Sequence, residues 1–267
     1  MVDVARRDTR VRALNDYFGN GGTSRALSLV ALVLMWWLTA YMVASPQLFP
    51  GPVPVAVFAW RKTVDGELPW NVLITLARVV AAFAVAMLAG CVFGYVAGRF
   101  RRVDSLIDPW AVTALNLPLL VVVVLAYIWV GLNDTAAVLA VAIAKAPTVF
   151  VTIREGARAL DPGLEEVGLV YRLPFRRRLR RIELPQLLPY VAAAARSGLS
   201  ITWKIVLVVE LLGRPNGIGF ILNLYFQNFD VIGILAYGLT FATIMLVVET
   251  TLLQPWEKSA NAWRRRA

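Results

Sequence analysis

The chain has 267 residues, of which 59% are hydrophobic and only 16% are charged. Soluble domains have about 25% charged residues, so this composition excludes an ordinary soluble domain and indicates a polytopic membrane protein. The chain has no histidine and a single cysteine, Cys91. These counts exclude histidine-based catalytic or metal sites and disulfides within the chain. The net charge of +10 is better explained by basic cytoplasmic loops than by nucleic-acid binding.

Several apolar runs are long enough to cross a bilayer, which takes about 20 residues. They lie at 26–45, 72–98, 111–131, 135–153, 187–212 and 231–254. No internal repeat or low-complexity linker separates them. The sequence therefore predicts one all-α domain of six transmembrane helices over 26–254, with an N-terminal segment at 1–25 and a basic tail at 255–267.

Basic residues are distributed unequally over the connecting segments. The segments 1–25, 99–110, 154–186 and 255–267 together carry twenty lysines and arginines, whereas the alternate loops carry only Arg61, Lys62 and Arg214. Cytoplasmic loops collect Lys and Arg, so we expect both termini and the 154–186 loop to be cytoplasmic.

The two longer external segments have distinct compositions. The 46–69 segment is proline-rich, and we expect 55–60 to form a short interfacial helix. The 213–230 segment opens with helix-breaking Gly and Pro residues, but 218–229 is too apolar for an ordinary loop. We expect that part to pack back into the protein.

Small residues recur every four positions in the second run. They are Ala82, Ala86, Gly90, Gly94 and Gly98. This spacing places them on one helix face and predicts the close approach of another helix.

The 154–186 loop holds the densest charge of the chain, with six arginines between Arg172 and Arg181. Asp161 and Pro162 are typical of the N-cap and first position of a helix. Pro174 disfavours helix at the preceding residue and can open a second helix that ends near Pro185. The loop is thus predicted to form two short helices at an angle. Charge alone favours a plain cytoplasmic loop with surface helices.

The order of residues in this loop resembles the EAA loop of ABC importer permeases. Glu166-Val167-Gly168 is followed at the matching distance by Ile182-x-Leu184-Pro185. Arg172 stands where that motif has a glycine, and we expect Leu173-Pro174 to carry the turn instead. The resemblance implies that the loop contacts a partner ATPase. The implied coupling residues are Glu165, Glu166, Val167, Gly168, Arg172, Leu173 and Pro174.

The resemblance extends over about residues 48–262 and is strongest to the nitrate/sulfonate/taurine branch of these permeases. It is carried by GELPWNVLITLARVVAAFAVAMLAG, LIDPWAVTALNLPLL, GARALDPGLEEVG and WKIVLVVELLGRPNGIGFIL. It implies a type I importer permease fold in the bacterial cytoplasmic (inner) membrane. The implied partners are a second permease copy, a cytoplasmic ATPase dimer and a periplasmic or lipid-anchored binding protein.

No GxxxxGK[ST] phosphate loop occurs in the sequence. We therefore expect no cofactor and no enzymatic activity in this chain, with ATP and Mg bound by the partner ATPase.

Ionisable residues inside the runs are costly and point to pairs or to a water-filled path. They are Arg78, Lys145, Arg196, Lys204, Glu210 and Glu249. Arg78, Lys145 and Lys204 lie about 10–15 Å from the external ends of their runs, at 1.5 Å per residue. They either collect an anion at one depth, or form structural pairs or extend their charged groups to the interface. Arg196 is expected to pair with Glu249.

The roles of other residues in the apolar runs can also be interpreted in two ways. Asn116 and Pro118 interrupt a helix and either line a path or produce a packing kink. Glu210 is either a gate or a structural partner at the outer mouth. The predicted path residues are Asn116, Pro118, Lys145, Trp203, Lys204 and Glu210.

These observations favour the permease subunit of an importer for a small anion such as nitrate, a sulfonate, taurine or a related carboxylate. An importer of a neutral or cationic heterocycle is the alternative within the class. A membrane enzyme is disfavoured by the absence of histidine and the few carboxylates. A channel or secondary transporter is disfavoured because no inverted repeats occur.

Overall fold

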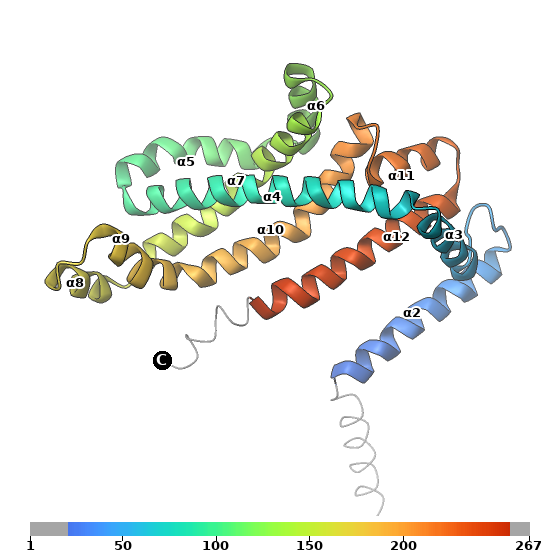
Figure 1. Ribbon diagram of the computed structural model, residues 1–267, viewed down its shortest axis with the longest axis horizontal. Helices are drawn as coiled ribbons and strands as arrows, with labels where there is room; N and C mark the ends of the chain where they lie inside the picture. Colours follow the sequence, from blue (N-terminus) through green and yellow to red (C-terminus); the bar gives the residue numbers. More distant parts are fainter. Residues whose placement is uncertain (1–20, 257–267) are drawn as a thin grey trace, which may run out of the picture.

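The computed structural model describes residues 21–256, and every element within them is helical (Figure 1). The expected cytoplasmic ends of the chain lie largely outside the described residues. The α-helices are α2 (Gly21–Val43), α3 (Pro52–Val64), α4 (Glu67–Arg99), α5 (Arg101–Asn116), α6 (Leu119–Val130), α7 (Asp134–Arg158), α8 (Pro162–Val170), α9 (Phe175–Arg178), α10 (Leu184–Gly213), α11 (Ile218–Gln227) and α12 (Val231–Val248). Two π-helical turns, η1 (Leu179–Glu183) and η2 (Glu249–Leu253), lie before α10 and after α12.

The long helices α4, α7 and α10 form the centre of the bundle, and the predicted small-residue stripe lies where α4 meets α7. A Cβ atom at Gly90 would lie 2.5 Å from Val149 Cβ, and one at Gly94 would lie 2.6 Å from the Phe150 carbonyl oxygen. Only glycine permits the two backbones to approach this closely. The prediction of close helix packing is confirmed.

Two apolar clusters hold the remaining helices to this centre. The first joins α4, α6, α7 and α10 through Val79, Val123, Val141, Val206 and their neighbours. The second joins α4, α11 and α12 and consists of Leu68, Val72, Ile218, Ile221, Tyr237, Phe241 and Met245. Ile218 and Ile221 are buried, so the segment after α10 packs back into the protein as expected.

By length and composition, α4, α7, the helical stretch that includes α10, and the stretch that includes α12 can each cross a membrane. The expected span 111–131 is not one straight helix, because α5 and α6 meet at a bend of 101°. Leu117 adopts an extended conformation before Pro118, as expected for a residue that precedes proline. The first expected span overlaps α2, of which Leu27–Val43 is a shorter apolar helix. Its role as a sixth span stays a prediction.

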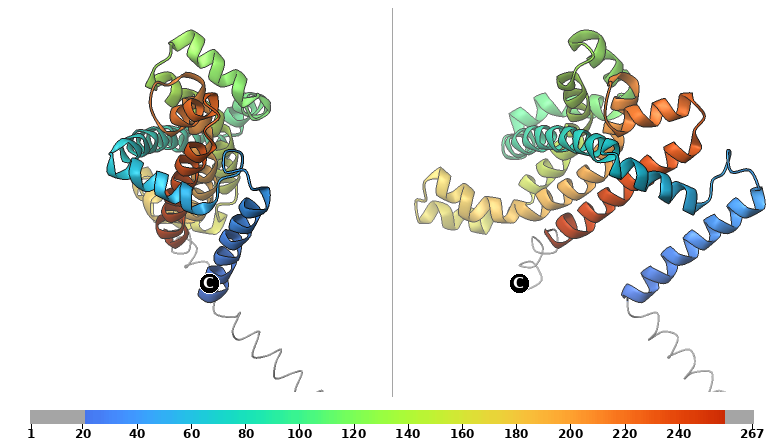
Figure 2. Two further views of the ribbon diagram at one scale, coloured as in Figure 1. Left: turned by 90° about the vertical axis from the view of Figure 1, so that its right-hand side faces the viewer. Right: turned by 45° about the vertical axis from the view of Figure 1, so that its right-hand side comes forward.

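The short helices gather at opposite ends of the bundle (Figures 1 and 2). At one end, α8 and α9 lie beside the C-terminal end of α4. At the other end, α3 and α11 lie beside its N-terminal end. Segments that the distribution of basic residues assigns to opposite sides of the membrane therefore lie at opposite ends of the bundle. The segment 55–60, expected to form a short interfacial helix, lies within α3. Near the end of α3, Lys62 donates a hydrogen bond to Glu67, which raises the pKa of the lysine.

Candidate functional site

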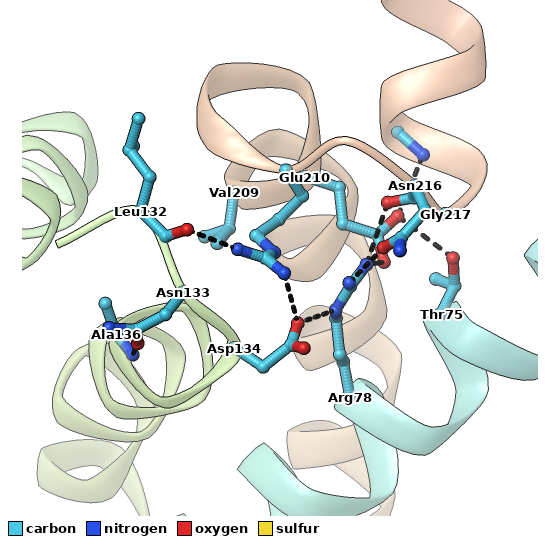
Figure 3. Close-up of polar contacts among 12 residues, drawn as sticks. Thr75, Arg78, Leu132, Asn133, Asp134, Ala136, Val209, Glu210, Asn216 and Gly217 are labelled. Carbon is cyan, nitrogen blue, oxygen red and sulfur yellow. Dashed lines mark hydrogen bonds and ion pairs between the residues drawn. The ribbon is translucent and has the colours of Figure 1, made fainter.

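A polar network surrounds the Arg78 guanidinium in the N-terminal half of α4, close to the start of α11 (Figure 3). Arg78 Nη1 lies 2.7 Å from Glu210 Oε1 of α10, and Nε lies 2.7 Å from Asp134 Oδ1 at the start of α7. Nη1 also donates to the Asn216 carbonyl oxygen at 2.9 Å. Glu210 is fully buried, so its charge depends on these partners.

The second oxygen of Glu210 fixes the start of α11. It accepts hydrogen bonds from the Thr75 hydroxyl and from the Gly219 backbone N–H, both at 2.9 Å. Gly217 has a φ of +102°, and a Cβ atom there would lie 2.5 Å from the Glu210 carboxylate. The turn before α11 therefore requires glycine. The buried carboxylate also neutralises the positive end of the α11 dipole.

Asp134 extends the network to the loop after α10. Its Oδ1 lies 3.1 Å from Arg214 Nη2, while Arg214 Nη1 donates to the Leu132 carbonyl oxygen at 2.6 Å. Two arginines thus face two carboxylates, which leaves no net charge for an anion. We call Thr75, Arg78, Asp134, Glu210, Arg214 and Asn216 the outer network. It ties α4, α7, α10 and α11 together.

Lys145 has a different environment. Its side chain is only 2% exposed and lies against α10, where a Cβ atom at Gly198 would be 3.5 Å from Lys145 Cε and 3.2 Å from the Phe83 ring of α4. Among residues 21–256, Lys145 has no hydrogen-bond or ion-pair partner. An unpaired ammonium group therefore sits within the helix interface.

Lys204 is exposed on α10, with its Nζ 5.5 Å from the centroid of the Trp203 ring. Trp203 packs edge-on against Phe241 of α12 at 5.8 Å. Lys204 follows Gly198 by six residues, which is about 9 Å along the helix and a different face. One chain therefore does not bring Arg78, Lys145 and Lys204 together. Of the two readings for Arg78, the structural pair is the one found.

The remaining intramembrane predictions have separate outcomes. Arg196 Nε lies 3.9 Å from Glu249 Oε1, so the expected pair is confirmed. Asn116 and Pro118 are exposed at the bend between α5 and α6, where Asn116 donates to the Val112 carbonyl oxygen at 2.8 Å. Their contact with a path stays a prediction. No cluster of three carboxylate or thiol side chains that could hold a metal occurs in the described part of the chain.

The first short helix expected in the 154–186 loop forms as α8, but the second does not end near Pro185. Instead α9 continues through η1 into α10 as one helical stretch from Phe175 to Gly213. Pro185 lies in the first turn of α10, a position that tolerates proline. Asp161 accepts a hydrogen bond from the Gly163 N–H at 2.8 Å and so caps α8. Glu166 and Val167 are exposed, whereas Gly168 is buried. A Cβ atom at Gly168 would lie 3.1 Å from Ile182 Cδ1, so this glycine lets the two limbs of the loop approach.

The expectation that Leu173-Pro174 carries the turn is wrong. The left-handed residue is Arg172 itself, with a φ of +46°. The Leu173 N–H donates to the Gly168 carbonyl oxygen at 2.9 Å, which closes α8 with the turn that usually ends in glycine. Arg172 thus adopts the backbone conformation of the glycine that it replaces in the motif.

Comparison with known proteins identifies the class. The model of the family "Binding-protein-dependent transport system inner membrane component" matches residues 82–254. An aliphatic sulfonates transport permease protein assigned in Bacillus subtilis is 26% identical over 203 residues, covering 75% of this chain and 74% of that protein. The bicarbonate transport system permease protein of Synechococcus elongatus is 26% identical over 174 residues, covering 64% of this chain and 63% of that protein.

Solved structures support the same fold. An amino acid ABC transporter chain has a TM-score of 0.56 at 20% identity, covering 77% of this chain and 96% of that chain. A chain of the MetNI methionine ABC transporter in an inward-facing conformation has a TM-score of 0.58 at 16% identity, covering 73% of this chain and 95% of that chain. The all-α importer permease fold is therefore shown.

Proposed function

Because the chain belongs to the family of inner-membrane components of binding-protein-dependent transport systems, we propose that it forms the translocation path for a small anion. Nitrate, a sulfonate, taurine or a related carboxylate is the substrate class. Two copies of the chain assemble with a cytoplasmic ATPase dimer, which binds ATP and Mg, and with an external binding protein. The chain itself performs no chemistry.

The burial of Lys145 without a partner is the observation that supports a negatively charged substrate. A lysine at a helix centre costs about 2.5–3.5 kcal/mol on insertion scales. This cost is offset when α7 and α10 separate during transport and an anion reaches the ammonium group. The sulfonate and bicarbonate named for two relatives are anions of the required size and charge.

The exposed face of α10 supplies the rest of the proposed path. Lys204 faces away from the α4–α7 interface, and the Trp203 ring beside it forms a half-buried wall. In a homodimer this face meets the corresponding face of the second copy. Asn116 and Pro118 are proposed to line the same space at the α5–α6 bend. Glu210 takes part only as the anchor of the outer network.

The 154–186 loop is proposed as the ATPase contact, with the loop and both termini in the cytoplasm. The alternation of basic loops supports this orientation. Glu166 and Val167 supply the exposed surface of α8 at this end of the bundle. The turn at Arg172, Leu173 and Pro174 sets the angle between α8 and α9.

The test is uptake of labelled nitrate and labelled alkanesulfonate into proteoliposomes that contain the complete complex and its binding protein. Lys145→Ala and Lys204→Ala are expected to reduce uptake, and Lys204→Glu to reduce it further because it reverses the local field. Lys62→Ala is the control, since Lys62 is paired with Glu67 on the external side. Parental uptake by Lys145→Ala and both Lys204 variants would refute the anion path.

A further inference from the structure

Two polar contacts join the 154–186 loop to one face of α4. Arg99, the last residue of α4, forms an ion pair with Glu165 in the first turn of α8. Tyr95, one turn earlier on α4, donates its hydroxyl to Glu183 at the end of η1. Both limbs of the loop are therefore fixed to the same helix face. We call these two contacts the α4 links.

Glu183 is the most constrained member of the α4 links. Its side chain is fully buried, and its other oxygen lies 3.1 Å from Arg178 Nε. Glu183 ends a π-helical turn, whose extra residue changes the direction in which the following side chains project. A buried carboxylate with two donors and a π-helical turn both cost stability, so packing alone does not explain their presence.

The α4 helix connects these links to the outer network without interruption. Thr75 and Arg99 are 24 residues apart on α4, which corresponds to about 36 Å of continuous helix. Between them, the small-residue stripe packs α4 tightly against α7. A displacement at Tyr95 and Arg99 is thus carried along a rigid element to Thr75 and Arg78.

We propose that Tyr95, Arg99, Glu165 and Glu183 are positioning residues that transmit movement of the 154–186 loop through α4 to the outer network. Glu165 thereby acts inward, on Arg99, while Glu166 remains free for the ATPase surface. This inference rests on the proposed function and assigns a transmission route within it. The outer network opens or closes when the loop moves, because residues of the α4 links and of the outer network lie on the same helix, α4.

The experiment measures two quantities in the reconstituted complex: ATP hydrolysis with and without loaded binding protein, and substrate taken up per ATP hydrolysed. Tyr95→Phe and Arg99→Glu are expected to lower uptake per ATP by about fivefold or more, within the usual range of coupling between sites. The ATPase subunits should remain bound, because the exposed surface of α8 is unchanged. The double variant R99E/E165R restores the ion pair and should recover most of the coupling.

The controls are Tyr41→Phe and Arg101→Glu, which make the same kinds of change at exposed residues outside the 154–186 loop. Both should keep parental coupling. If the parental complex transports but Tyr95→Phe and Arg99→Glu keep its uptake per ATP, the transmission route is refuted and the proposed function stands. If the double variant is no better than Arg99→Glu, the ion pair is not the cause and the route is likewise refuted. A parental complex without ATP-driven uptake would refute the proposed function itself.

Discussion

Replacing Lys145 with methionine is expected to stabilise the protein while it impairs transport. Methionine has a similar length and flexibility, so it fills the space against Gly198 without a large cavity. It removes an ammonium group that is 98% buried and unpaired within the described chain. The insertion cost of a lysine at a helix centre sets the gain at about 2–3 kcal/mol. For a domain of this size, that corresponds to a rise in Tm of about 5–10 °C.

The assay is the fraction of complex that elutes intact from size-exclusion chromatography after heating in detergent, measured beside uptake in proteoliposomes. Lys62→Met is the matched control and should give no rise, because Lys62 already has Glu67 as a partner. If replacing a residue stabilises the protein but impairs transport, that residue is retained for its function. If Lys145→Met instead lowers the Tm, the lysine has a structural role and is not retained for transport.

Substitutions in the outer network are expected to destabilise the protein. Glu210→Ala should lower the free energy of unfolding by about 3–5 kcal/mol, because it leaves Arg78 without its buried partner. Asp134→Asn, at a side chain that is 61% exposed, should lower it by about 1 kcal/mol or less. Equal losses of Tm would contradict this. Arg172→Gly should relieve about 1 kcal/mol of left-handed strain and slow amide exchange in α8 by about fivefold; unchanged or faster exchange would count against it. Glu166→Arg should leave the permease folded but weaken ATPase binding in a pull-down, and undiminished binding would exclude Glu166 from that contact.

Much of the fold could be predicted from the sequence because membrane helices have strong local signals. Apolar runs located the central helices, and the small-residue stripe located the α4–α7 contact. The 101° bend at Pro118 was less predictable. A proline is compatible with a kink or with a full break, and tertiary packing decides between them.

The polar sites were harder to predict because they depend on residues distant in sequence. Depth along each run placed Arg78 with Lys145 and Lys204, but depth contains no information about helix rotation. Asp134 and Glu210 lie 56 and 132 residues from Arg78 and still neutralise it. Local propensity does not predict the left-handed turn at Arg172, because Pro174 restricts only Leu173 and arginine does not favour a positive φ. The glycine of the motif signalled a left-handed residue there, whatever side chain stands in its place.

The central claim, ATP-driven import of a small anion through this chain, is tested most directly with the parental complex. Purified permease, its ATPase and its binding protein would be reconstituted, and uptake of labelled nitrate, alkanesulfonate and taurine would be compared with that of a cationic heterocycle. We expect uptake of at least one anion that requires both ATP and the binding protein. ATP-dependent uptake of the cation without uptake of any anion would contradict it.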